Sequence, residues 1–207
     1  MKYSKLLILI IFILLVDQCL KIYIKTHFYY GQEVALLGSW FRLHFIENEG
    51  MAFGMKFGDA SIAKLVLTLF RLVAVGFGFY YLNVMIKKGF KNATLICAAL
   101  ILAGAFGNLI DSIFYGKLFS ESSFCLAQWV PWGKGYANLF YGRVVDMLYF
   151  PLIEWTLPSS TPFIGAYTIR FFEPVFNIAD ASISIGVLTL LFFQKRLLTL
   201  PKEVKTD

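Results

Sequence analysis

Two short Asn-x-x-Asp patterns lie inside apolar stretches, where charged side chains are not expected. Asn108 and Asp111 are three residues apart near the end of one stretch, and Asn177 and Asp180 repeat the spacing near the start of another. Residues three apart share one face of a helix. An ionisable group inside a membrane segment costs about 2.5 to 3.5 kcal/mol on insertion scales, so it requires a partner or a function. Two such faces at one depth of a small bundle are expected to face each other.

A further carboxylate, Asp146, follows Val144 and Val145 in the connection between these stretches and precedes apolar residues 148–153. A re-entrant or interfacial position is expected for it. Two close carboxylates cannot both ionise easily, so they share a proton, and one acts as base toward water while the other acts as acid. Singly, each carboxylate is more typical of a helix cap or an ion-pair partner. Their convergence favours peptide hydrolysis without a metal.

Two more ionisable side chains lie in the first apolar stretch. Asp17 and Lys21 are four residues apart, which puts them on one helical face where they can pair. We interpret them as a structural ion pair, because charges are buried mainly as pairs.

Other catalytic chemistries find little support in the sequence. The two histidines, His27 and His44, form no HExxH pattern, so no zinc site is expected. The three cysteines show no CxxC spacing, and no GxSxG pattern supplies a serine nucleophile. Neither a metal nor a cofactor is therefore expected.

The elements that must position the carboxylates are membrane helices. The 207-residue chain is 58% hydrophobic and only 15% charged, whereas a soluble domain carries about 25% charged residues. Four apolar stretches approach the roughly 20 residues that span a bilayer, namely residues 6–24, 62–86, 94–115 and 175–193. Pro174 can start the last helix. We predict an all-α membrane protein that forms a single domain over residues 1–207, with four transmembrane helices.

The net charge of +6 is explained by basic residues that flank the apolar stretches rather than by a nucleic-acid surface. These residues are Lys2, Lys5, Lys87, Lys88, Lys91, Lys195, Arg196, Lys202 and Lys205. Because cytoplasmic loops collect Lys and Arg, both termini and the 87–91 turn are expected in the cytoplasm. The connections 26–60 and 116–174 are then extracytoplasmic.

Both long connections have compositions typical of a membrane surface. Residues 26–60 contain five glycines among aromatics and a β-prone piece at 40–46, which predicts a small extracytoplasmic β-rich element. Residues 116–174 are rich in Trp, Tyr and Phe, as in segments at the headgroup layer. The first apolar stretch is also compatible with a cleavable signal peptide, but no small-residue cleavage site follows it, so we interpret it as a retained helix.

Five motifs, in order along the chain, resemble those of the lipoprotein signal peptidase (signal peptidase II) family. They are Asp17-Gln18-x-x-Lys21, Asn48-Glu49-Gly50-Met51-Ala52-Phe53-Gly54, Gly107-Asn108-Leu109-Ile110-Asp111, Val144-Val145-Asp146 and Phe176-Asn177-Ile178-Ala179-Asp180. Any one of them alone is weak. Together they span nearly the whole chain and are highly specific.

The resemblance implies an aspartyl membrane peptidase of the bacterial inner membrane, active near the outer leaflet. It removes the signal peptide from prolipoproteins after diacylglyceryl has been attached to a cysteine, and cleaves just before that cysteine. By motif position, Asp146 and Asp180 would form the catalytic dyad. The implied partners are lipid-modified prolipoproteins and membrane lipids, and we expect a monomer. The remaining motif residues would bind substrate (Asn48, Gly50, Asn108 and Asn177) or support the pocket (Asp17, Lys21 and Asp111).

The chain departs from the family pattern in two ways. Many members carry Arg directly after the third-helix Asp, where this chain has Ser112. Arg143 is a candidate to make the missing contact with Asp111. Segments 117–143 and 155–170 are also longer than in compact members and are interpreted as an outer cap.

Two other classes of function remain open at this point. In a proton or ion transporter, Asp17, Asp111 and Asp180 would form a relay, but the chain shows no internal repeat and its polar groups gather toward one side. In a non-catalytic assembly factor, the asparagines would join helices. The assembly factor predicts mild, independent effects of Asp146→Asn and Asp180→Asn, whereas a dyad predicts near-complete loss from either.

Overall fold

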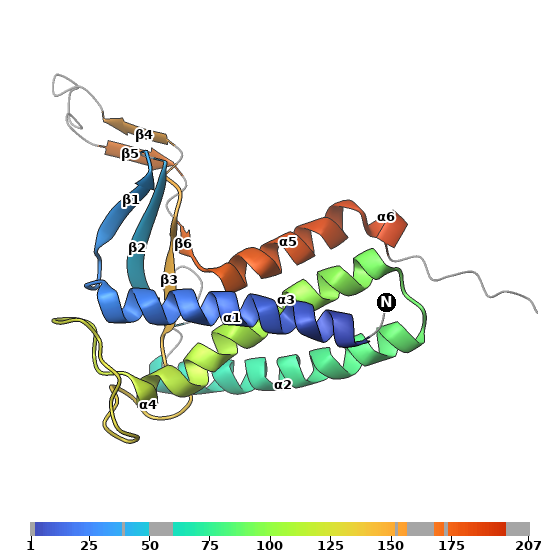
Figure 1. The fold of residues 1–207 in the computed structure, drawn as a ribbon, viewed down its shortest axis with the longest axis horizontal. Coiled ribbons are helices and arrows are strands. Elements are labelled where there is room, and N and C mark those ends of the chain that lie inside the picture. The colour runs from blue at the N-terminus through green and yellow to red at the C-terminus, as the bar shows by residue number, and fades with distance from the viewer. Residues whose placement is uncertain are drawn as a thin grey trace, which may run out of the picture.

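The computed structural model describes residues 3–38, 40–49, 60–151, 153–156, 168–171 and 174–197. Four helices run side by side, and a small antiparallel sheet stands across one end of them (Figure 1). The N-terminus and the turn between the second and third helices lie at the opposite end (Figure 1). The four helices are α1 (Tyr3–His27), α2 (Ala60–Lys87), α3 (Asn92–Ile110) and α5 (Ile178–Phe192).

Three of the expected spans are confirmed as helices long and apolar enough to cross a membrane: Tyr3–His27, Ser61–Lys87 and Asn92–Leu118. Their outward surfaces are apolar, with Phe70 69% and Val73 71% exposed. Such surfaces suit contact with lipid rather than water.

The fourth helix is shorter than the sequence predicts. α5 has 15 residues, because Val175 and Phe176 form strand β6, which pairs with another strand. The expectation that Pro174 starts this helix is therefore wrong. Asn177 is the N-cap, and its side chain accepts a hydrogen bond from the Asp180 backbone N–H.

Close approach of α3 and α5 depends on glycine. A Cβ atom on Gly104 would lie 2.1 Å from the Ala179 carbonyl oxygen, and one on Gly186 would lie 2.8 Å from that of Cys97. Small residues let membrane helices pack backbone to backbone. The contact brings the end of α3 that carries Asn108 against the start of α5.

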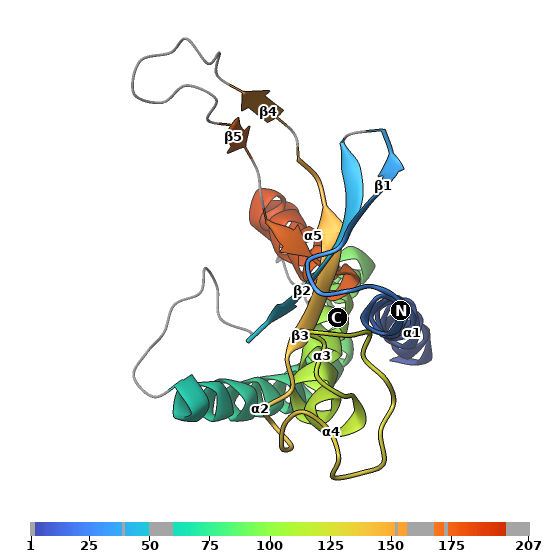
Figure 2. The same cartoon turned by 90° about the vertical axis from the view of Figure 1, so that its left-hand side faces the viewer.

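The β-rich element predicted within residues 26–60 is confirmed as two strands of a larger sheet. Its strand order is β1 (Glu33–Leu37), β2 (Phe41–Asn48), β3 (Val144–Tyr149) and β6 (Val175–Phe176), all antiparallel. Figure 2 shows this sheet across the ends of α1 and α3. A second, two-stranded sheet pairs β4 (Ile153–Thr156) with β5 (Thr168–Phe171).

The third span changes its winding at its outer end. After Ile110 the chain forms a π-helical turn, Asp111–Tyr115, and a short helix α4, Gly116–Leu118. The chain then returns through 119–143, where the Gly142 N–H donates to the Ser112 carbonyl at 2.9 Å. π-helical turns are frequent at functional sites, and this one carries Asp111. A short helix α6, Gln194–Leu197, follows α5.

Candidate active site

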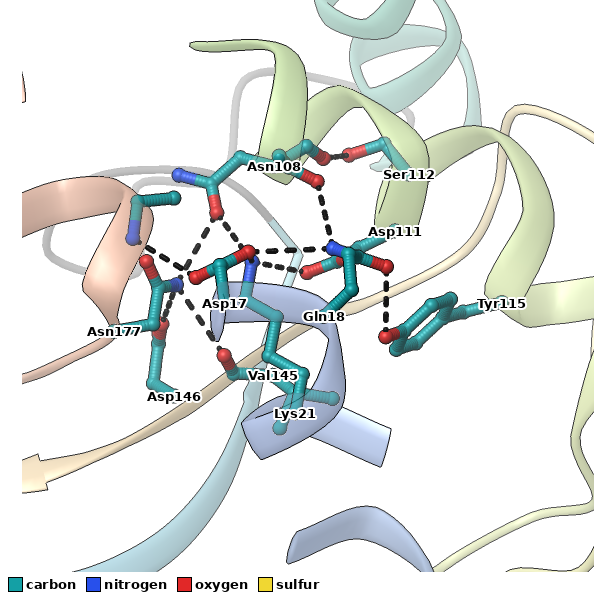
Figure 3. Close-up of polar contacts among 12 residues, drawn as sticks. Asp17, Gln18, Lys21, Asn108, Asp111, Ser112, Tyr115, Val145, Asp146 and Asn177 are labelled. Carbon is teal, nitrogen blue, oxygen red and sulfur yellow. Dashed lines mark hydrogen bonds and ion pairs between the residues drawn. The ribbon is translucent and has the colours of Figure 1, made fainter. Parts of the chain in front are cut away.

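Strand β3 brings Asp146 to the place where α3 and α5 meet. Asp146 is 2% exposed, and the Asn177 side-chain amide donates to its Oδ1 at 2.6 Å and to the Val145 carbonyl at 3.3 Å (Figure 3). The sequence-based expectation of a re-entrant or interfacial segment did not include a strand. Pairing of β3 with β2 and β6 supplies the backbone partners that an irregular segment would lack.

The two Asn-x-x-Asp faces meet, as predicted. The Asn108 amide donates to Asp180 Oδ1 at 2.7 Å, and the Asn177 amide donates to Asn108 Oδ1 at 3.2 Å. Because Asn177 also donates to Asp146, a chain of amides joins the two carboxylates. Asp146 comes from the sheet and Asp180 from the start of α5. We call this arrangement the amide bridge.

The N-terminus of α5 is held by side-chain oxygens. Asn177 Oδ1 accepts from the Asp180 N–H at 2.8 Å, and Asp17 Oδ1 accepts from the Ala179 N–H at 2.9 Å. Both contacts satisfy amide groups that have no partner inside the helix. α5 is thereby fixed against α1, and Asp180 is fixed with it.

Lys21 is the cation at the centre of the site (Figure 3). Its ammonium lies 2.9 Å from Asp17 Oδ2, 2.7 Å from Asp111 Oδ2 and 2.8 Å from Asn108 Oδ1. The predicted pair with Asp17 is confirmed, and Asp111 joins it. Gln18 adds a bond to Asp111 Oδ1 at 2.8 Å. A buried cation with three oxygen partners is well compensated, so Lys21 can set the position of Asn108 in the amide bridge.

Electrostatics favour a proton on Asp146. Burial, followed by the charge of Asp180, raises the pKa of Asp146 to about 7, against the opposing effects of Lys21 and of hydrogen bonds from Asn177 and Asn48. Asn48 lies at the end of β2, opposite Val144. A carboxyl that holds a proton near neutral pH beside a second carboxylate is an arrangement suited to paired acid and base chemistry.

A second buried ionic cluster lies beside the site, around Glu47 of β2. Glu47 forms an ion pair with the fully buried Lys25 and lies 3.0 Å from the Arg143 guanidinium. Arg143 also lies 2.7 Å from Glu121, and Ser122 bonds to Glu47 at 3.0 Å. Sequence reasoning missed Lys25, Glu47 and Glu121. The four-residue spacing from Lys21 to Lys25 was an available signal for a shared helical face.

Arg143 does not replace the family arginine at Asp111 among the described contacts. Its guanidinium is engaged by Glu47 and Glu121, and the Asp111 carboxylate is engaged by Lys21 and Gln18. That hypothesis is wrong because β3 directs Arg143 toward β2 and the 119–143 segment. Ser112 donates to the Asn108 carbonyl within its own helix at 2.9 Å.

Some predicted site residues and segments lie outside the part of the chain that the structure describes. Gly50 and most of its motif belong to the interval between Glu49 and Ala60, which is not among the described residues. Of segment 155–170, only short strand portions are described, whereas 117–143 is described throughout. Within the described residues, no group of three or more His, Cys, Asp or Glu side chains is arranged to hold a metal ion.

Comparisons with known proteins agree with this geometry. The family model described as signal peptidase (SPase) II matches residues 9–195. A lipoprotein signal peptidase of Porphyromonas gingivalis is 50% identical over 193 residues, covering 93% of this chain and 83% of that protein. One of Amoebophilus asiaticus is 38% identical over 184 residues, covering 87% and 73%.

Solved structures support the fold. A bacterial membrane enzyme determined by the in meso method at 2.3 Å aligns with a TM-score of 0.55 and 21% identity, over 98% of this chain and 96% of that one. A second such enzyme, at 1.9 Å, aligns with a TM-score of 0.56 and 20% identity, over 94% of each chain. With the family model and the relatives, the conclusion is that the chain belongs to the signal peptidase II family of aspartic, lipoprotein-processing membrane proteases.

Proposed function

We propose that this protein cleaves diacylglyceryl-modified prolipoproteins just before the lipidated cysteine, with Asp146 and Asp180 as its catalytic dyad. The amide bridge carries the proposal. Asn177 holds Asp146 at 2.6 Å, Asn108 holds Asp180 at 2.7 Å, and the two amides are themselves 3.2 Å apart. Two carboxylates from different elements are thus oriented toward one place by donors that satisfy both.

The dyad divides the chemistry between its members. Asp146 carries the shared proton, in keeping with its raised pKa of about 7, and the partly exposed Asp180 is the ionised base. Asp180 takes a proton from water as the water oxygen attacks the scissile carbonyl, and Asp146 gives its proton to the carbonyl oxygen. As the resulting diol collapses, Asp180 gives its proton to the leaving amine and Asp146 takes a proton from a diol hydroxyl. Both aspartates then return to their starting protonation states.

The position of the site suits a substrate that is anchored in lipid. Asp146 lies on β3 and Asp180 in the first turn of α5, and these two elements meet at the end of the helix bundle where the sheet begins (Figure 1). A signal helix in the bilayer and a diacylglyceryl group at its surface would confine the scissile bond to that depth, which lowers the entropic barrier to reaction. Asn48, Gly50, Asn108 and Asn177 remain predicted substrate contacts, with Asn108 and Asn177 also orienting the dyad.

The proposed orientation has four spans, with α5 as the fourth, both termini in the cytoplasm and the dyad near the outer leaflet of a bacterial inner membrane. The basic residues that follow α2 and α5 support it. Cys125, which is exposed in the 119–143 segment, provides a test. A membrane-impermeant maleimide should label it in intact spheroplasts. A variant that combines Cys125→Ser with Lys88→Cys should not be labelled until the membrane is permeabilised. The reverse pattern would invert the orientation.

The activity is tested by gel-shift cleavage of a diacylglyceryl-modified prolipoprotein by the purified protein in detergent. Asp146→Asn and Asp180→Asn should each lower kcat by on the order of a thousandfold or more, because the loss of either member disables a pair that acts as one unit. Both variants should keep the fold. Glu33→Gln, at a surface carboxylate that pairs with Arg42, is the matched control. Substrate left intact by the folded parent, or cleaved by either Asn variant at the parent rate, would refute the proposal.

A further inference from the structure

One arginine of α2 faces the interior of the helix bundle. Thr68 and Val75 are buried, at 2% and 6% exposure, whereas Phe70 and Val73 are 69% and 71% exposed. Arg71 lies three residues after Thr68 and four before Val75, which is the spacing of a single helical face. It is only partly exposed. The Arg71 side chain therefore belongs to the inward face of α2 and not to its lipid-facing surface.

Two contacts establish how α2 is aligned with α3. Toward the cytoplasmic side of the bundle, the Phe79 and Phe106 rings pack edge to face with centroids 5.9 Å apart. Toward the sheet, the Thr68 hydroxyl donates to the Phe140 carbonyl at 3.1 Å, and the Phe140 N–H donates to the Ile113 carbonyl at 3.2 Å. Thr68 is thus level with the region of Ile113, and Phe79 is level with Phe106.

This alignment places Arg71 at the depth of the dyad. Helices rise about 1.5 Å per residue. Arg71, one turn from Thr68 in the direction away from the sheet, therefore lies level with the end of α3, beside Asn108 and Asp111. Asn108 is the residue that holds Asp180. The carboxylates whose charges act on the Arg71 guanidinium are Asp180 first and Asp111 second. Asp111 is already paired with Lys21, which leaves Asp180 as the principal anion for this arginine.

We propose that Arg71 is a positioning residue that pairs with the Asp180 carboxylate and orients it as the base of the dyad. The inference rests on the proposed function, because it presumes that Asp180 is catalytic. An arginine suits the role, since its guanidinium stays charged when buried and its planar donors match a carboxylate. The other ionisable groups around Asp180 come from three elements: Asp17 and Lys21 of α1, Asp111 of the π-helical turn and Asp146 of β3.

The charge arrangement explains why such a cation is needed. Lys21 pairs with Asp17 and Asp111 and also opposes the raised pKa of Asp146, so one ammonium faces more carboxylates than its single charge can balance. Arg143 is engaged by Glu47 and Glu121. Arg71, on the inward face of α2, is then the remaining described cation at this depth whose charge acts on Asp180.

The activity test compares Arg71→Gln and Arg71→Lys with the parent in the prolipoprotein cleavage assay between pH 4.5 and 9. Arg71→Gln should lower kcat by about tenfold to a hundredfold with little change in KM, and it should move the acidic midpoint of the pH–rate profile upward by about one unit. Arg71→Lys should keep most of the parent kcat and most of the parent position of the acidic midpoint. Lys87→Gln, which removes a cation from the end of α2, is the control and should match the parent. An unmoved midpoint in Arg71→Gln would overturn the inference.

A second measurement does not depend on activity. Thermal unfolding of Arg71→Gln, Asp180→Asn and the double variant should show coupling, so that the double variant loses less than the sum of the single losses. Additive losses would overturn the inference. Failure of the proposed function is distinguishable, because Asp180→Asn would then cleave prolipoprotein at the parent rate whatever the behaviour of the Arg71 variants.

Discussion

The two buried ionic clusters of this protein differ in their balance of charge. Around Glu47, three cations (Lys25, Lys64 and Arg143) meet three glutamates (Glu47, Glu49 and Glu121). Around Lys21, a single ammonium serves both Asp17 and Asp111. Asp146 and Asp180, the proposed dyad, lie beside this second cluster and are joined to it through Asn108 and Asn177.

The difference separates a structural cluster from the one that adjoins the proposed catalytic dyad. In the Glu47 cluster, buried charges of opposite sign pair with one another and join α1, β2 and the 119–143 segment. Beside Lys21, burial and then the charge of Asp180 instead raise the pKa of Asp146, because burial and a like charge both disfavour ionisation. A buried carboxyl next to a second carboxylate, with neutral amides as hydrogen-bond donors to both, suits the proposed proton transfer.

The largest expected effect comes from removing the ammonium of each cluster in turn. Lys21→Met leaves Asp17 and Asp111 buried without their cation, so it should cost about 3–5 kcal/mol of unfolding free energy and lower activity by at least about a hundredfold through the shift of Asn108. Lys25→Met leaves Glu47 paired with Arg143 and should cost about 1–3 kcal/mol.

The difference between the two clusters is tested by measuring both kcat and the unfolding temperature of Lys21→Met and Lys25→Met. Lys25→Met should keep activity within about tenfold of the parent, because Lys25 has no described contact with the dyad and a misplaced dyad is what costs larger factors. Equal losses of activity in the two variants would remove the distinction between the clusters.

A smaller effect is expected from separating the helices beneath the catalytic cluster. A methyl group on Gly104 would collide with the Ala179 carbonyl, whereas a methyl group on Gly76 of α2 would have nothing within 4 Å. Gly104→Ala should cost about 1–3 kcal/mol by overpacking and lower kcat about tenfold, since α5 carries Asp180. Gly76→Ala is the matched control and should retain parent activity. Similar kcat values for both variants would contradict this account of the helix contact.

The pH dependence of stability sharpens the comparison further. With its pKa raised to about 7 in the folded protein against about 3.9 in an unfolded chain, Asp146 binds its proton more tightly when folded. The free energy of unfolding contributed by this group therefore falls as pH rises from about 4 to about 7. Thermal unfolding of Asp146→Asn should show a weaker decline over that range than the parent. A steeper decline in the variant would disprove the assignment of the proton.

The smallest effect is expected at the rim of the structural cluster. Glu121→Gln removes a carboxylate that is 40% exposed, while Arg143 keeps Glu47. The loss of unfolding free energy should stay within about 1 kcal/mol, as for exposed ion pairs, with unchanged kcat. A loss of activity as large as that of Lys21→Met would show that the two clusters act as one.

Much of the site could be predicted from local patterns. The spacing of Asp17 and Lys21 predicted their pairing, and the two Asn-x-x-Asp motifs predicted facing helices, because burial of polar groups in apolar segments forces them together. By contrast, the strand that carries Asp146 and the ion pairs of Arg143 with glutamates were not predicted. Both depend on pairing of β3 with β2, a contact between segments about one hundred residues apart that no local period encodes.

The sequence by itself therefore determined which segments are apolar helices, which polar residues must meet within them, and which family the motifs resemble. Tertiary structure alone decided that Asp146 reaches the site on a strand, that α5 begins at Ile178 after β6, and that Arg143 pairs with glutamates. The physical reason is that helical faces follow from spacing along the chain. Strand pairing and ion-pair choice follow instead from which distant segments share one buried surface.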